Sequence, residues 1–348
     1  MIVKYNFLFN FAATRTGGGL KRLYEYTKWF HKKGGACFIV HPNCEFLIKK
    51  FPNNHYFIVL QTRTQRLFKD CDYLTDIKKE VGIPDLYYSY GIPVYYHFGK
   101  INWFHLSNVL PLNSKNMEVS LFDRFVRLRL LGWKMSKNFK NVDIISAESL
   151  NSLSMIKNQN TKEMFLSING SDDEIIFLQN RVEIEKDNMA VIVGTQRYKS
   201  LLDSYRVFET LKKKNKLLKL FLIGDKSHIP KQLVNNKSVV LTGVISQSEV
   251  IEYLKKTKYY ISTTLVENSF NAASEGVVFA DESYISDIAP HRELLERESF
   301  ERVSIPLLSN SVLRIKGENI SGKNLKLWDV VIREMLEKVM SYEKNYHD

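Results

Sequence analysis

Two glutamates, Glu267 and Glu275, stand at the ends of the segment ENSFNAASE. The segment follows YYISTTLV (259–266), an apolar and β-branched run that predicts a strand, and its own small and polar residues predict the start of a helix. If Asn268 or Ser269 caps that helix, the second glutamate lies about two turns inside it, roughly 12 Å along the axis from the first. Two carboxylates that far apart are not a glycosidase pair, whose members face one bond across roughly 5 to 10 Å.

The two glutamates suit an elongated ligand instead. Each carboxylate could hold one end of the ligand, and the free N–H groups at the helix start could hold phosphates between them. A nucleotide sugar has that shape, with a hydroxylated sugar, a diphosphate and a hydroxylated ribose. The alternative is an ordinary capped helix that has one acid at its favourable N-terminus and the other acid exposed.

Two cations occur in VGTQRYKSLLDSYRVF (193–208), in the loop between a predicted strand and the helix that follows it. Arg197 offers a planar fork of donors and Lys199 a point charge, so both are suited to a diphosphate at the mouth of a βα unit. The alternative is a solvated loop without a ligand.

Three glycines, Gly17, Gly18 and Gly19, separate the first predicted strand from a helix in TRTGGGLKRLYEY (14–26). Glycine lets the backbone approach a ligand closely, and the helix start offers unpaired N–H groups to an anion. The spacing is not G-x-G-x-x-G, so the dinucleotide fingerprint is absent. A flexible turn explains the glycines equally well.

One histidine, His105 in INWFHLSNVLP, falls at the expected carboxyl end of a strand. Ligands of open α/β sheets bind at that edge, which favours a binding or catalytic role. A lone histidine is more often a structural residue whose ring nitrogens are both satisfied. Both roles stay open at this point.

The elements that must position these side chains alternate between strand-like and helix-like patterns, which predicts parallel α/β sheets. The first series of predicted strands comprises 2–9, 36–41, 56–60, 85–90, 101–107 and 142–147, and the second comprises 189–195, 218–225, 239–243 and 259–264. Between the two series lies an acidic, turn-rich segment, 168–188. The expected fold class is therefore α/β, with two doubly wound, Rossmann-like parallel-sheet domains that face each other across a cleft.

The expected domain boundaries follow from this shift in composition. Residues 1–180 form the first Rossmann-like domain and residues 181–326 the second. Residues 327–348 form an amphipathic C-terminal helix that either closes the second domain or crosses back to the first. Ligands are expected between the carboxyl ends of the two sheets.

Composition narrows the class of protein. At 348 residues, 44% of them hydrophobic, the chain is too long for a small binding module. The net charge of +12 predicts attraction to polyanions such as nucleic acid, nucleotide phosphates or an anionic bilayer. The cysteines, Cys37, Cys44 and Cys71, lack C-x-x-C spacing, so neither a disulfide framework nor a zinc site is expected. No secretory signal or long apolar run is visible, so the expected location is the cytoplasm.

In their order along the chain, these motifs resemble the retaining glycosyltransferases of group 1, family 4, which have the GT-B fold. The resemblance covers most of the chain, and its motifs are the glycine turn, FHLSN (104–108), ING (168–170), VGTQRYKS (193–200), LFLIG (220–224), the two-glutamate segment and ISDIAPHREL (285–294). The later part is most similar to bacterial enzymes that build surface polysaccharides such as O-antigen and capsule. The resemblance implies transfer of a hexose from a UDP- or GDP-linked sugar to a glycan hydroxyl, without a metal and without a cofactor other than the donor substrate.

The resemblance also implies roles for individual residues. The implied donor-binding set is Gly18, Gly19, Val244 near the nucleobase, the backbone of Asn268, Ser269 and Phe270 at the diphosphate, and Glu275 at the ribose. The implied catalytic set is His105 and Glu267 at the donor sugar, with Arg197 and Lys199 at the leaving phosphates. Two positions depart from the family pattern: Thr195 stands where the family often has arginine, and GVVFADES (276–283) replaces the usual small-residue and Gly-Pro run.

The acceptor side is suggested by LFDRFVRLRLLGWKMSKNFK (121–140), in which basic and apolar residues interleave. A basic helix of this kind could rest on anionic lipid at the inner face of the cytoplasmic membrane. Its burial against the first sheet with the basic residues solvated is the alternative, and both can hold. The resemblance implies a lipid-linked glycan acceptor, and no nucleic-acid partner is expected.

Two other functions fit the same residues. A nucleotide-sugar 2-epimerase of GT-B fold would react with the donor and need no acceptor. A non-enzymatic polyanion- or membrane-binding protein on a degenerate GT-B scaffold would bind in a salt-sensitive way without either glutamate.

Overall fold

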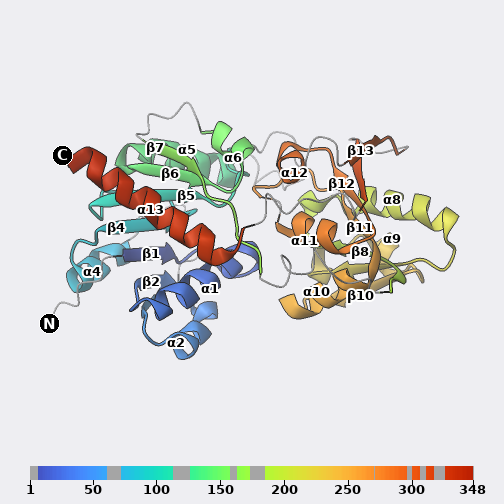
Figure 1. Ribbon diagram of the computed structural model, residues 1–348, viewed down its shortest axis with the longest axis horizontal. Helices are drawn as coiled ribbons and strands as arrows, with labels where there is room; N and C mark the ends of the chain where they lie inside the picture. The colour runs from blue at the N-terminus through green and yellow to red at the C-terminus, as the bar shows by residue number, and fades with distance from the viewer. Residues whose placement is uncertain are drawn as a thin grey trace. The chain divides into compact units, whose positions relative to one another are not determined.

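The chain forms two compact units (Figure 1). The computed structural model describes residues 7–60, 72–112, 126–156, 163–172, 185–269, 271–295, 300–305, 311–316 and 326–347. The first unit contains Met1–Lys115, Ser120–Gly170 and Lys326–Asp348, and the second consists mainly of Ser171–Leu325. The boundary expected at residue 180 falls outside the described residues.

The first unit is built on a parallel sheet of seven strands in the order β3-β2-β1-β4-β5-β6-β7. Its strands are β1 (Phe7–Phe11), β2 (Cys37–Val40), β3 (His55–Ile58), β4 (Leu86–Tyr90), β5 (Ile101–Leu106), β6 (Ile144–Ala147) and β7 (Glu163–Leu166). Its helices are α1 (Gly17–Lys32), α2 (Phe46–Lys50), α4 (Asp72–Val81), α5 (Leu128–Asn138), α6 (Leu150–Ser154) and α13 (Trp328–His347). Strands β2, β4 and β5 are buried along their whole length, as expected where helices cover both faces of a sheet.

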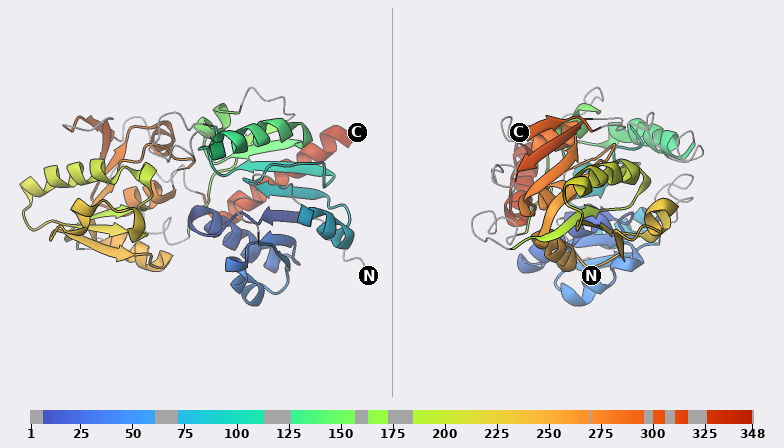
Figure 2. Two further views of the ribbon diagram at one scale, coloured as in Figure 1. Left: turned by 180° about the vertical axis from the view of Figure 1, so that it is seen from behind. Right: turned by 90° about the vertical axis from the view of Figure 1, so that its right-hand side faces the viewer.

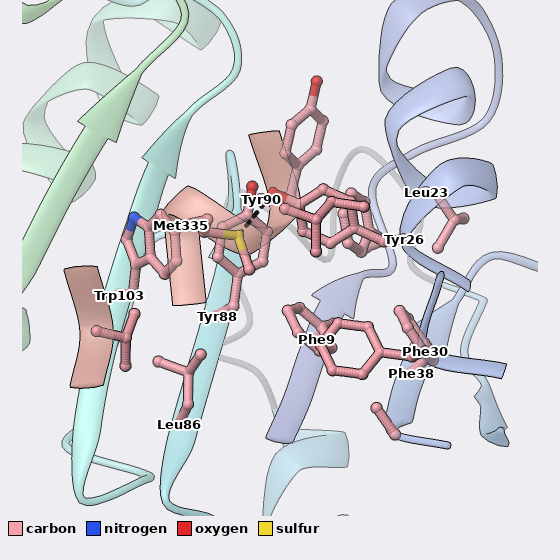
Figure 3. Close-up of a cluster of buried hydrophobic side chains, with 14 of the residues drawn as sticks. Phe9, Leu23, Tyr26, Phe30, Phe38, Leu86, Tyr88, Tyr90, Trp103 and Met335 are labelled. Atoms are coloured by element: carbon pink, nitrogen blue, oxygen red, sulfur yellow. Dashed lines mark hydrogen bonds between the residues drawn. The ribbon is translucent and has the colours of Figure 1, made fainter. Parts of the chain in front are cut away.

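Aromatic rings fill the core of this first unit (Figure 3). The ring of Phe9 on β1 stacks on Phe38 of β2, with centroids 5.1 Å apart, and packs against Phe30 of α1 at 4.9 Å. Tyr88 meets the indole of Trp103 edge-on at 4.9 Å. Offset and edge-to-face geometries such as these add to the free energy of burial.

The C-terminal helix α13 packs on the first unit, on the same face of the sheet as α1 (Figures 1 and 2). The hydroxyl of Tyr26 lies 2.8 Å from the sulfur of Met335, and the indole N–H of Trp29 donates to Asp329 at 2.8 Å. Gly170, where the chain leaves the unit, leaves room for Trp328, because a Cβ atom there would lie 2.6 Å from the indole ring.

The second unit also contains a seven-stranded sheet, in the order β10-β9-β8-β11-β12-β14-β13. Its strands are β8 (Asp187–Val193), β9 (Lys219–Ile223), β10 (Val239–Gly243), β11 (Thr257–Ser262), β12 (Glu282–Ser286), β13 (Phe300–Val303) and β14 (Val312–Lys316). Its α-helices are α8 (Leu201–Lys214), α9 (Lys231–Val234), α10 (Gln247–Lys256), α11 (Asn271–Phe279) and α12 (Ala289–Leu294).

The two sheets confirm the predicted class of doubly wound α/β domains, but several of their strands were not predicted from sequence. The sequence pattern did not predict β7, β12, β13 or β14, and the last two are antiparallel additions at the edge of an otherwise parallel sheet. Antiparallel β13 is half exposed, so it lacks the apolar run of a buried strand.

Candidate functional site

The second sheet brings the chemically interesting loops to one edge. Strands β8, β9, β10, β11 and β12 are parallel, so their carboxyl ends lie together. The strand order reverses between β8 and β11, which are neighbours in the sheet although β9 and β10 separate them in sequence. Ligands of open α/β sheets bind at such a switch point, outside the carboxyl ends of the strands. A ligand site in this unit is therefore expected at the loops that follow β8 and β11.

Hydrogen bonds hold these two loops together. The backbone N–H of Leu265 donates to the carbonyl of Tyr198 at 2.8 Å, and the hydroxyl of Thr263 donates to the carbonyl of Ser200 at 2.9 Å. Ser200 adopts the left-handed conformation, with φ of 47°, and ends the short 3₁₀ turn Arg197–Lys199 before α8 begins. The fixed loops set the positions of the side chains that they carry.

Lys199 and Glu267, one from each loop, form an ion pair. The side chain of Lys199 is 10% exposed and that of Glu267 is 19% exposed, so water screens the pair weakly. Burial acts to lower the pKa of Lys199, but the Glu267 carboxylate more than offsets this effect and the pKa is raised. Lys199 is therefore a permanent cation, held beside a carboxylate at the carboxyl edge of the sheet.

Arg197 lies in the same 3₁₀ turn, but its residue is exposed, unlike Lys199. Thr195, at the position where the family pattern often has arginine, donates its hydroxyl hydrogen to the carbonyl of Asp225 at 2.6 Å. This bond ties the loop after β8 to the loop after β9. Thr195 thus has a structural partner, and the enclosed cation of this loop is Lys199.

Helix α11 carries Glu275. Its described part begins at Asn271, so Glu275 lies about one turn beyond that residue, and the cap expected at Asn268 or Ser269 adjoins Phe270, which is outside the described residues. The Glu275 carboxylate accepts a hydrogen bond of 2.9 Å from the side-chain amide of Gln247, at the start of α10. The next residue, Gly276, lets α11 pack closely on β11, because a Cβ atom there would lie 2.3 Å from the ring of Tyr260.

The remaining expected donor residues in this unit lie around the same edge. The hydroxyl of Ser269 donates to the side chain of Asn271 at 3.1 Å, and Asn268 is partly buried beside it. Phe270 lies outside the described residues. Val244 follows β10 and is 80% exposed, which leaves its side chain available to a flat ring.

The expected residues of the first unit are Gly18, Gly19 and His105. Both glycines belong to the first turn of α1, directly after β1. A Cβ atom at Gly19 would lie 2.9 Å from the ring of Tyr90, which ends the neighbouring strand β4. The strand order of this sheet also reverses between β1 and β4, so the glycine turn lies at its switch point.

His105 is the penultimate residue of the buried strand β5 and has no exposed surface. Its Nδ1 atom lies 2.7 Å from the hydroxyl of Ser146 and its Nε2 atom 3.4 Å from Glu148, while its ring stacks on Tyr90 with centroids 5.3 Å apart. Burial, helped by the Arg22 cation, lowers the pKa of His105 to about 4. Both ring nitrogens have partners, which matches the structural alternative for this histidine, and its role at a donor sugar stays a prediction.

Three further residues, Gln247, Ser286 and His291, were not predicted from sequence to belong to the site. Gln247 directly follows Ser246, which forms a capping box with Glu249, and that S-x-x-E signature could have located the start of α10. Ser286 is the last residue of β12, a strand that was not predicted, and His291 lies on α12; both are inside the segment ISDIAPHREL, where no periodic pattern marks them. In the described parts of the chain, no group of three or more His, Cys, Asp and Glu side chains is arranged to hold a metal ion.

Comparison with known proteins finds similarity in fold. Among solved structures, HepE from Anabaena, in complex with UDP and glucose, matches with a TM-score of 0.64 and 11% identity over 97% of this chain and 100% of its own. Sucrose-phosphate synthase from Thermosynechococcus elongatus matches with a TM-score of 0.72 and 11% identity over 97% and 99%. A glycosyltransferase from Rickettsia africae matches with a TM-score of 0.63 and 12% identity over 98% and 99%. No family model and no curated protein matches the sequence.

These matches extend over nearly the whole of both chains, and they agree with the two seven-stranded units. The protein therefore has the GT-B fold, as the sequence motifs implied. Since identities of 11 to 12% establish the fold alone, the activity has to be argued from the site.

Proposed function

We propose that the protein is a glycosyltransferase that moves a hexose from a UDP- or GDP-linked sugar to a hydroxyl group of a glycan. The observation that carries this proposal is the pair formed by Lys199 and Glu267 at the switch point of the second sheet. A cation suits the diphosphate of such a donor, and an adjacent carboxylate accepts hydrogen bonds from sugar hydroxyls. HepE, which has the same fold, binds UDP, glucose and UDP-glucose, and this supports a nucleotide sugar as the ligand.

In this proposal, the site stabilises the departing nucleoside diphosphate. A diphosphate is already a good leaving group, so fixed positive charge on its oxygens is needed more than a strong acid. Lys199 supplies an enclosed charge, and Arg197 adds an exposed one in the same turn. The reaction would then proceed without a metal. Glu267 would bind the sugar, and Glu275, oriented by Gln247, would bind the ribose hydroxyls.

The stereochemistry and the acceptor are further parts of the proposal. Retention would have the acceptor hydroxyl attack the face from which the diphosphate leaves, and the acceptor would be a lipid-linked glycan of surface-polysaccharide synthesis. Helix α5 and the 3₁₀ turn after it (Phe139–Asn141) support a membrane contact. On the helix, Arg129, Trp133 and Lys137 are exposed while Leu128, Gly132 and Met135 are buried, and Lys140 in the turn is also exposed. No helix in the described ranges is long and apolar enough to cross a bilayer. In the proposal, the contact of α5 would be with the inner face of the cytoplasmic membrane.

A ligand panel followed by a transfer assay tests the proposal. Purified protein is heated with UDP-, GDP- and ADP-sugars, and the matching donor should raise the unfolding temperature by mass action. That donor is then incubated alone and with glycan acceptors, and the products are read by NMR. A glycosidic product made only with acceptor supports the proposal. An epimer formed from the donor alone indicates the epimerase, and salt-sensitive polyanion binding without any donor effect indicates the non-enzymatic function.

A further inference from the structure

His291 on α12 is a buried side chain that the proposed function leaves unused. Its Nδ1 atom lies 2.8 Å from the carbonyl oxygen of Ser286 and 3.2 Å from the hydroxyl of the same residue. A carbonyl oxygen only accepts hydrogen bonds, so Nδ1 carries the proton and Nε2 is a bare acceptor. Within the described parts of the chain, Nε2 is buried and meets no hydrogen-bond donor.

The ring belongs to the same surroundings as the Lys199–Glu267 pair. Burial lowers the pKa of His291 to about 4, while Glu267 acts to raise it and Lys199 to lower it, so both members of the pair act on the ring. The hydroxyl of Ser286 donates to the carbonyl of Thr264 at 2.7 Å, in the loop that carries Glu267. His291 is thus neutral near pH 7, and Ser286 connects it by hydrogen bonds to the loop after β11 that carries Glu267.

A buried acceptor that lacks a donor costs folding free energy, and exceptions of this kind call for an explanation in a functional site. We propose that Nε2 of His291 accepts a hydrogen bond from a hydroxyl group of the sugar that Glu267 binds. This rests on the proposed function and names a further sugar-contacting residue for it. Glu267 and His291 would then each supply an acceptor to the same sugar, which suits the hydroxyl donors of a hexose.

In this proposal, the donor opens the Lys199–Glu267 ion pair before its sugar reaches His291. Nε2 is buried while the ammonium group of Lys199 is bonded to Glu267. The diphosphate of the donor competes for this ammonium group, because a phosphate binds cations through charge-assisted hydrogen bonds. Its arrival releases the carboxylate, and the sugar attached to the diphosphate then enters between the released side chain and the imidazole.

Two substitutions separate an acceptor role from a purely structural one. His291→Asn keeps an N–H donor near the position of Nδ1, so the contact with Ser286 can persist, but it removes the acceptor at Nε2. His291→Gln places an amide oxygen near Nε2 and removes the donor at Nδ1. The readouts are kcat/KM for sugar transfer, the affinity for free UDP or GDP, and the unfolding temperature.

We expect His291→Asn to lower kcat/KM by about tenfold or more while the affinity for the free nucleotide is unchanged, since the nucleotide carries no sugar. His291→Gln should retain more transfer than His291→Asn, even if it unfolds at a lower temperature. Transfer by His291→Asn at the parent rate overturns the inference, and so does an equal loss of nucleotide and nucleotide-sugar affinity. If the unmodified protein binds no nucleotide sugar at all, the proposed function itself fails.

Discussion

Lys199 and Glu267 are 68 positions apart in sequence, yet the ammonium group of one is bonded to the carboxylate of the other. The pair exists because β8 and β11 are adjacent at the centre of the second sheet, and because the loops after them share backbone hydrogen bonds. Any donor that places a diphosphate on Lys199 must break or share this bond. The Lys199–Glu267 ion pair should therefore affect both the stability of the protein and its proposed activity.

Breaking this ion pair from one side should destabilise the fold more than removing both charges. Lys199→Met leaves the carboxylate of Glu267 mostly buried without its cation, which costs about 3 kcal/mol of unfolding free energy. Adding Glu267→Gln removes that unpaired charge and should restore part of the loss. Urea unfolding of the parent, both single variants and the double variant measures the coupling. Strictly additive losses would contradict a direct interaction.

The same two substitutions should differ in their effects on binding and transfer. Lys199→Met should lower kcat for transfer by about 10²- to 10³-fold, since it removes fixed charge from the developing leaving group. Glu267→Gln should lower transfer while the affinity for the free nucleotide changes little, because its carboxylate is assigned to the sugar. Isothermal titration with the nucleotide and steady-state kinetics with the full donor separate the two effects. Parent-like transfer by both variants would remove the basis of the proposed function.

Glu275 offers a test of the nucleotide end of the site. Glu275→Ala should weaken binding of the free nucleotide by about tenfold, the loss expected for hydrogen bonds from ribose hydroxyls to a carboxylate. Gln247→Ala leaves the carboxylate in place without its 2.9 Å partner, so its effect should be smaller and in the same direction. Titration with ribo- and 2′,3′-dideoxyribonucleotides gives the comparison. Equal weakening of both nucleotides in Glu275→Ala would argue against a ribose contact.

The fold and the pairing of two site loops could be predicted from sequence, whereas the network inside the site could not. Buried parallel strands read as continuous apolar runs, and ligand-bearing loops follow their carboxyl ends, so Lys199 and Glu267 could be placed at one edge without coordinates. Half-exposed β13 lacks such a run, and in β14 the charged residues Arg314 and Lys316 interrupt it. The N-terminal cap of α11 could not be fixed from sequence, because Asn268, Ser269 and Asn271 are all residues that occur at helix caps.

Buried polar contacts between distant segments also could not be predicted from sequence, and those of Arg22 are the clearest example. Its guanidinium group is fully enclosed and donates to the carbonyls of Ser167 and Ile168 at 2.8 and 2.9 Å and to the side chain of Asn169 at 3.0 Å. In sequence, Arg22 is one more basic residue on an amphipathic helix, and nothing marks it as a partner of a segment 145 to 147 positions away. Contacts of this range depend on how the helix packs on the sheet.

Arg22 also predicts how the first unit would lose stability. Arg22→Met removes the donor to the carbonyls of Ser167 and Ile168 and to the side chain of Asn169, near the point where the chain leaves the unit, and it should cost roughly 3 to 5 kcal/mol of unfolding free energy. Lys32→Met, at an exposed position in the last turn of the same helix, is the control and should have an effect near zero. Thermal and urea unfolding compare the two. A similar small effect for both variants would show that the Arg22 contacts do not contribute to stability.

Helix α5 predicts binding to anionic membranes. Trp133 is 56% exposed, and the ammonium group of Lys137 lies 5.0 Å from the centre of its ring, so a cation and an amphipathic ring share one surface. Arg129→Gln with Lys137→Gln should weaken binding to phosphatidylserine vesicles by roughly fivefold for each charge, or about 1 kcal/mol each. Lys213→Gln with Lys214→Gln, exposed on α8, is the charge-matched control. Equal losses for the two double variants would point to net charge instead of a defined surface.

Two buried histidines predict acid sensitivity in a defined range of pH. Burial lowers the pKa of both His105 and His291 to about 4, from 6.5 in an unfolded chain. Between these values the unfolded chain binds protons that the folded chain excludes, so the free energy of unfolding should fall as the pH drops from about 6.5 to about 4, by several kcal/mol in total. Above pH 6.5 the two residues should contribute no slope. Urea unfolding at pH 7.5, 6.0 and 5.0 measures the effect. His105→Asn and His291→Asn should each remove about half of the histidine contribution, and the double variant should remove all of it. His228→Asn, at an exposed position, is the control. A slope that persists unchanged in the double variant would assign the acid sensitivity to other groups.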